Sequence, residues 1–165
     1  MVRERFENLD PDKQQQLYEA AADEFSENGF EGASLNRIID RAGMSKGSLY
    51  YYFNDKSDLY SSLMERATTM LVKLVGGFAL EDLTAENFWP SFEGTVRRSV
   101  GYLQRNEWFV RLSRSFYRMR GGRSHKATKR FFDWIGGWTG KVLARGQELG
   151  VVRTDLPMEF LVELT

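Results

Sequence analysis

The feature that most constrains the fold is the stretch Ser34–Asp58, in which two short amphipathic patterns flank one glycine. Residues 35–42 place apolar side chains at i, i+3, i+4 and i+7, the spacing of one buried face on a helix. Gly43 is expected to end this helix, because glycine alone adopts a positive φ without steric cost. The stretch therefore predicts a helix, a tight turn and a second helix.

The second helix is expected over residues 46–52, with Ser45 as its N-cap. Leu49 and Phe53 would turn inward. The residues of this helix that would be available to face outward are Lys46, Gly47, Ser48, Tyr50 and Tyr51. A short helix, a glycine turn and a second helix with a polar leading end form a helix-turn-helix, whose second helix enters the DNA major groove by its N-terminal end.

This stretch resembles the DNA-binding half of the TetR (tetracycline repressor) family of bacterial regulators. The matching residues are Phe30-Glu31-Gly32-Ala33-Ser34, Ile38, Ile39, Ala42-Gly43, the run Met44–Phe53, Lys56 and Leu59. They cover roughly the first third of the chain. The resemblance implies a ligand-responsive transcription regulator, most often a repressor, that binds a palindromic operator as a homodimer.

By the same resemblance, nine residues are the expected DNA contacts: Ser34, Arg37, Ser45, Lys46, Gly47, Ser48, Tyr50, Tyr51 and Lys56. Lys46 can donate to guanine or phosphate, and Gly47 lets the backbone approach the DNA closely. The alternative is that the tyrosines only pack and the lysines are solvated. We assign such a packing role to Tyr52.

The distribution of charge is unexpected for a DNA-binding protein. The net charge is zero, yet residues 1–65 hold seven Lys or Arg against thirteen Asp or Glu. DNA contact is therefore expected through a few placed cations and not through a broad basic patch. Residues 1–9 are interpreted as a solvated charged tail, with a DNA-binding arm through Arg3 and Arg5 as the alternative.

The rest of the chain predicts helices only, so the expected fold is all-α. Residues 11–28 form the first predicted helix, with Leu17, Ala21 and Phe25 on its buried face. We expect a three-helix helix-turn-helix domain over residues 1–55 and a helical effector-binding and dimerisation domain over residues 56–165. The chain stops inside an apolar pattern at Leu164-Thr165, so this second domain is interpreted as truncated at its C-terminus.

The second half is rich in aromatic residues, which favours a cavity for an apolar or aromatic effector. The candidate effector residues are Trp89, Phe92, Tyr102, Trp108, Phe109, Arg114, Phe116, Trp134 and Trp138. The alternative is that the aromatic residues are core, and that the arginines form a solvated face.

Other classes of function have less support. The chain has no Cys and one His, so we expect no metal site, and neither a catalytic set nor a cofactor motif is recognisable. No signal or membrane-spanning run is recognisable, and a cytoplasmic protein is expected. Two alternatives stay open: a regulator that answers to a protein partner without a small-molecule pocket, and a helical ligand-binding protein that does not bind DNA.

Overall fold

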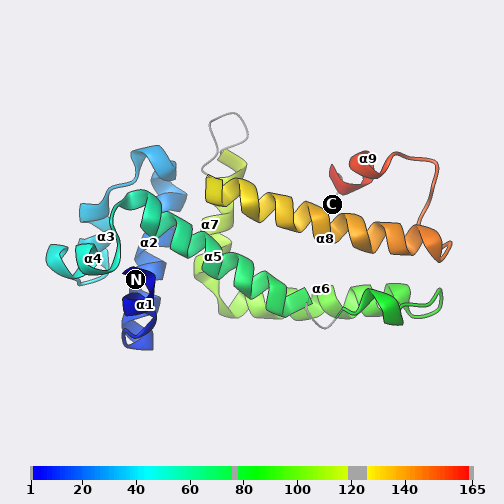
Figure 1. Ribbon diagram of the computed structural model, residues 1–165, viewed down its shortest axis with the longest axis horizontal. Coiled ribbons are helices and arrows are strands. Elements are labelled where there is room, and N and C mark those ends of the chain that lie inside the picture. Colours follow the sequence, from blue (N-terminus) through cyan, green and yellow to red (C-terminus); the bar gives the residue numbers. More distant parts are fainter. Residues whose placement is uncertain (1, 76–77, 119–125, 164–165) are drawn as a thin grey trace. The chain divides into compact units, whose positions relative to one another are not determined.

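The computed structural model describes the backbone of residues 2–75, 78–118 and 126–163, and the side chains of residues 4–75, 78–113 and 126–162. Within these ranges all regular elements are helices (Figure 1), which confirms the all-α prediction. In chain order they are α1 (Val2–Glu7), α2 (Pro11–Gly32), α3 (Leu35–Arg41), α4 (Lys46–Tyr52), α5 (Lys56–Val75), the 3₁₀ turn η1 (Leu80–Asp82), α6 (Phe88–Arg105), α7 (Glu107–Arg118), α8 (Lys126–Glu148) and α9 (Met158–Glu163).

Contacts between residues group the chain into two compact units. Unit 1 comprises Met1–Ala67 and Leu103–Thr128, and unit 2 comprises Thr68–Tyr102 and Lys129–Thr165. This grouping differs from the sequence division at residue 55, because α7 packs along α2 inside unit 1. The helices α5, α6 and α8 each begin in one unit and end in the other.

The first long helix, α2, has the start and the buried face that its sequence predicts. The Asp10 carboxylate accepts two backbone N–H groups of the first turn, at 3.1 and 3.2 Å. Pro11 occupies the first helical position, where a missing N–H does not matter. Leu17, Ala21 and Phe25 are fully buried and form the centre of unit 1.

The predicted helix-turn-helix is present as α3, a turn and α4 (Figure 1). Each helix begins at a serine cap: Ser34 Oγ lies 3.5 Å from the N–H of Arg37, and Ser45 Oγ accepts the N–H of Ser48 at 3.0 Å. Gly43 has a φ of 61°, a conformation that costs glycine little and other residues much. The turn therefore depends on this glycine, as the sequence indicates.

The predicted solvated tail at residues 1–9 is wrong where the structure describes it. Residues 2–7 form α1, and Phe6 is only 2% exposed. Its ring lies edge-on to Tyr18, Tyr52 and Phe53, with centroids 5.3, 5.5 and 4.8 Å away. One aromatic side chain among charged neighbours thus fixes α1 against α4, and Tyr52 has the packing role predicted for it.

Unit 2 is built around a small aromatic core. Its buried residues are Phe78, Leu83, Phe88 and Val142, and the partly buried Leu80, Phe92, Trp138, Leu149, Val151 and Val152 pack against them. The α8 helix passes so close to Phe88 that a Cβ on Gly146 would lie 2.8 Å from its ring. Glycine at this position therefore permits the close approach.

The row of apolar residues spaced four apart along α6 is buried only at its start. Phe88 is buried and Phe92 is half-buried, but Val96 and Val100 are 44% and 48% exposed. Residues four apart on a helix are offset by about 40° in direction, so such a series turns away from the face on which it began. Pro90 lies in the first turn of α6, where proline is tolerated. Within the described residues, the helices are too short or too polar to cross a membrane.

Candidate nucleic-acid interface

The α4 helix is anchored on one face and open on the other. Leu49 and Phe53 are each 1% exposed, and they hold the helix against the core of unit 1. Tyr50 and Tyr51 are 47% and 54% exposed, which is unusual for such large side chains. These two tyrosines therefore present phenol groups to solvent from a firmly held helix.

The leading end of α4 adds polar groups beside the tyrosines. Lys46 and Gly47 are exposed, and the first turn of the helix contains no acidic residue. Ser45 and Ser48 share a hydrogen bond between their hydroxyls at 2.9 Å, so both help to fix this turn. Five predicted contacts, Lys46, Gly47, Ser48, Tyr50 and Tyr51, are thus brought together on one short helix.

Arg37, predicted to contact phosphate, has a partner inside the protein. Its Nε donates to Glu24 at 2.9 Å, and its Nη2 donates to Glu24 at 2.5 Å and to the carbonyl oxygen of Gly32 at 2.9 Å. Half of the Arg37 side chain remains exposed, whereas Glu24 is completely buried. The observed contacts of Arg37 join α3 to α2.

Glu24 is the central acceptor of this connection. It also accepts the N–H of Ser34, the cap of α3, at 2.9 Å. Burial alone would raise the pKa of Glu24, but hydrogen bonds from Arg37 and from Ser34, with the charges of Arg37 and Arg41, outweigh it and hold the pKa below its ordinary value. The carboxylate is therefore ionised at neutral pH and fixes the start of α3.

Lys56, another predicted phosphate contact, is likewise engaged. Its Nζ donates to the carbonyl oxygens of Glu31 and Ala33 at 2.9 and 3.0 Å. The same ammonium lies 5.0 Å from the centroid of the Phe30 ring. Lys56 thus ties the start of α5 to the last turn of α2 and to Ala33, which follows it.

Arg5, which the sequence suggested only as part of an alternative DNA-binding arm, lies beside the exposed tyrosines of α4. The guanidinium of Arg5, on α1, lies 4.9 Å from the centroid of the Tyr51 ring. Because Phe6 fixes α1, a cation is held next to an exposed tyrosine of α4. The sequence held one indication that α1 packs on the domain: Phe6 is a single aromatic residue within a charged segment.

The acidic residues of unit 1 are largely committed to structural partners. Asp23, Glu24 and Glu27 form ion pairs with arginines, and Asp10 and Asp55 accept backbone N–H groups at the starts of helices. Unit 1 thus has an excess of acidic residues, yet α4 itself carries a lysine and no acidic residue.

The predicted effector residues do not form one cluster among the described side chains. Trp108 and Phe109 are buried in unit 1, whereas Phe92 and Trp138 pack on Phe78 in unit 2. Of the others in unit 2, Trp89 is 52% exposed and Tyr102 and Trp134 are half-buried. Arg114 and Phe116 lie outside the described side chains.

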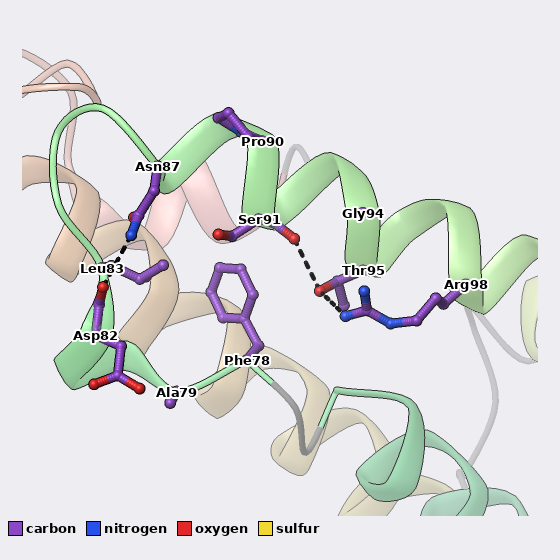
Figure 2. Close-up of a pocket in the computed structure, with 10 residues that line it drawn as sticks. All are labelled: Phe78, Ala79, Asp82, Leu83, Asn87, Pro90, Ser91, Gly94, Thr95 and Arg98. Atoms are coloured by element: carbon purple, nitrogen blue, oxygen red, sulfur yellow. Dashed lines mark hydrogen bonds between the residues drawn. The ribbon is translucent and has the colours of Figure 1, made fainter.

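A cavity of about 230 Å³ lies in unit 2 and involves none of these nine residues. It is lined by Phe78, Ala79, Asp82, Leu83, Asn87, Pro90, Ser91, Gly94, Thr95 and Arg98 (Figure 2). Polar side chains predominate on the α6 side. This lining differs from the aromatic one that the sequence favours.

Comparison with known proteins identifies the helix-turn-helix. The sequence pattern of the family described as bacterial regulatory proteins, tetR family, matches residues 17–63, which include all of α3 and α4. The chain carries the DNA-binding domain of the TetR family. It is a DNA-binding transcriptional regulator, and α4 corresponds to the second helix of its helix-turn-helix.

Three related proteins extend the comparison. The transcriptional repressor AcnR of Corynebacterium diphtheriae is 24% identical over 152 residues, which cover 90% of this TetR-family chain and 73% of that protein. The transcriptional activator FasR of Mycolicibacterium smegmatis is 40% identical over 57 residues, 34% of this chain and 26% of that protein. The crystal structure of FadR from Bacillus subtilis in complex with stearoyl-CoA has a TM-score of 0.68 at 17% identity, and covers 90% of this chain and 78% of that one.

Proposed function

We propose that this TetR-family chain acts as a homodimeric repressor that inserts α4 into the major groove of a palindromic operator and is controlled by a small-molecule effector. The observation that carries the proposal is the exposed edge of α4, where Lys46, Gly47, Tyr50 and Tyr51 face solvent above a buried apolar face. An exposed helix with such a leading end fits base and phosphate contacts in the major groove.

Arg37 and Lys56 support the surface mainly through positioning. Their observed partners join α2 to α3, and α5 to the segment before α3. Half of the Arg37 side chain is still exposed, so one face of its guanidinium can meet a phosphate while the other holds Glu24. The division into a DNA-binding part at residues 1–55 and an effector-binding and dimerisation part at residues 56–165 remains part of the proposal.

The proposed repression and effector control draw on the related proteins. AcnR is named a repressor, and FadR was crystallised with stearoyl-CoA. In a homodimer, the two α4 helices would read half-sites about 34–36 Å apart, one turn of DNA. An effector would act through its different affinity for the DNA-bound and released states, a coupling of about 1–3 kcal/mol.

The test is selection of binding sites from random duplex DNA, followed by fluorescence anisotropy on the enriched duplex. Wild type should enrich a two-fold symmetric sequence, and Lys46→Ala should lower its affinity at least about tenfold. The salt dependence should also lose about one unit of slope, since one phosphate-binding cation is removed. Lys141→Ala, which removes an exposed lysine of α8, is the matched control and should bind as wild type does. No enrichment, or equal binding by Lys46→Ala, would refute the proposal.

A further inference from the structure

The cavity of unit 2 has walls that hold their positions without a ligand. The Phe78 ring is packed edge-on against Trp138, with centroids 5.9 Å apart. The Asn87 amide donates to the carbonyl oxygen of Asp82 at 3.0 Å, and Arg145 donates to the carbonyl oxygen of Leu83 at 2.9 Å. The loop wall is therefore tied to α8 and to Asn87, the residue directly before α6, and the space is preformed.

The opposite wall is one face of α6 and carries an arginine (Figure 2). Arg98 Nη2 donates to Thr95 Oγ1 at 2.8 Å, and Thr95 Oγ1 donates to the carbonyl oxygen of Ser91 at 3.0 Å. Thr95 is 3% exposed, so this relay is fixed in the helix. It holds the guanidinium of Arg98 back along α6, beside the cavity.

Arg98 and its neighbour Arg97 have different kinds of hydrogen-bond partner. Arg97 forms an ion pair with Glu93 one turn earlier, at 2.6 Å. Within the part of the chain that the structure describes, Arg98 has no carboxylate partner. A guanidinium held by a neutral hydroxyl at the edge of a cavity retains most of its donors for an anion.

Size and charge narrow the class of ligand. A volume of about 230 Å³ lies below the roughly 300–1,000 Å³ of pockets that enclose drug-sized ligands. Arg98 is the one cationic side chain in the lining, and Asp82 is the one acidic side chain. A second negative charge on the ligand would therefore meet no second cation. Phe78, Leu83 and Pro90 supply apolar surface for the body of the ligand.

We propose that this cavity binds a small organic monocarboxylate, with the carboxylate on Arg98 and the hydroxyl of Ser91 and the apolar body on Phe78. This inference rests on the proposed function, because the bound monocarboxylate would be the effector of the regulator. This ligand is smaller and more polar than the apolar or aromatic effector that the sequence favours.

Benzoate is a suitable probe, because it combines one carboxylate with a compact apolar body, and benzamide is its uncharged counterpart. In a titration of ¹⁵N-labelled full-length chain, benzoate should shift the amide signals of Phe78, Ser91 and Thr95 in a saturable way. Benzamide should bind at least about tenfold more weakly, since its amide carries no negative charge and cannot form an ion pair with Arg98.

Arg98→Gln should weaken benzoate binding at least about tenfold, while Arg97→Gln, its neighbour on α6, should leave it unchanged. Equal binding by Arg98→Gln, equal binding of benzamide, or no saturable shift with wild type would each overturn the assignment. These readouts involve no DNA. If wild type still binds its selected duplex, their failure rejects the carboxylate site alone. Failure to bind any duplex rejects the proposed regulator even where benzoate binds through Arg98.

Discussion

Replacing Glu24 with glutamine tests whether one buried carboxylate fixes the start of α3. Its Oε1 receives the backbone N–H of Ser34 and two donors of Arg37, and its side chain has no exposed surface. Glutamine keeps an acceptor oxygen but removes the charge. Hydrogen bonds to charged groups contribute about 1.5–3 kcal/mol. Because half of the Arg37 side chain is hydrated, we expect the lower part of that range.

Glu24→Gln should therefore lower the free energy of unfolding by about 1.5–2 kcal/mol, measured by urea denaturation. In a chain of this size, that corresponds to a melting temperature lower by about 3–8 °C. Glu27→Gln is the matched control on the same helix. The Glu27 carboxylate pairs with Arg41 at 2.7 Å but is 55% exposed, so its loss should cost less than about 1 kcal/mol.

The pH dependence gives a second, independent readout. The folded-state pKa of Glu24 lies below the ordinary value of 4.5, so the stabilisation by its carboxylate is complete above that pH and is lost as the pH falls through the folded-state value. The stability difference between wild type and Glu24→Gln should be constant near neutral pH and should narrow below about pH 4.5. Equal stability of Glu24→Gln and Glu27→Gln, or a difference that does not narrow in acid, would refute the reasoning.

Three further substitutions test other parts of the structure. Gly146→Ala should destabilise the protein by about 1–3 kcal/mol in thermal unfolding, because the added Cβ would lie 2.4 Å from Val152. Gly137→Ala is the control: a Cβ there would meet no atom within 4 Å, so this variant should be neutral or stabilising. Phe6→Ala should cost about 3–5 kcal/mol in urea denaturation and also weaken DNA binding, and full retention of both would contradict the role of α1. Lys56→Met should weaken DNA binding and increase amide hydrogen exchange at the start of α3; unchanged exchange would mean that its two carbonyl contacts do not hold that segment.

The parts of the fold that sequence reasoning predicted are those encoded by neighbouring residues. The serine cap of α4 and the glycine turn before it involve residues within a few positions of one another. The burial of Leu49 and Phe53 follows from helical spacing in the same way. Such local features need no knowledge of the rest of the chain, so the helix-turn-helix could be predicted and was confirmed.

The partners of Arg37 and Lys56 could not be predicted in this way. Arg37 pairs with a residue thirteen positions earlier, and Lys56 with carbonyl groups 23 and 25 positions earlier. Helical spacing nevertheless held one signal, since Glu24 lies seven residues after Leu17 on the buried face of α2. An acid on an apolar face requires a cationic partner, which points to an arginine committed to structure.

The effector prediction relied on counting aromatic residues, which does not indicate where they meet. Trp108 belongs to the core of unit 1 because α7 packs on α2, a long-range contact that composition cannot reveal. The cavity lining instead depends on how the segment at Phe78 folds against α6. The nine predicted effector residues remain a prediction, and the cavity beside Arg98 is a different candidate for the effector site.

The most direct test of the account is site-specific photo-crosslinking from α4 to the selected duplex. The chain has no cysteine, so Ser48→Cys creates a single attachment point for an azidophenacyl group at the leading end of α4. Lys141→Cys provides the same group on α8 as the control. The account predicts that irradiation crosslinks the Ser48 position to bases within the symmetric half-sites and gives no base-specific product from the Lys141 position. Crosslinks from both positions alike, or none from position 48 while the duplex is bound, would contradict the assignment of α4 as the DNA-reading helix.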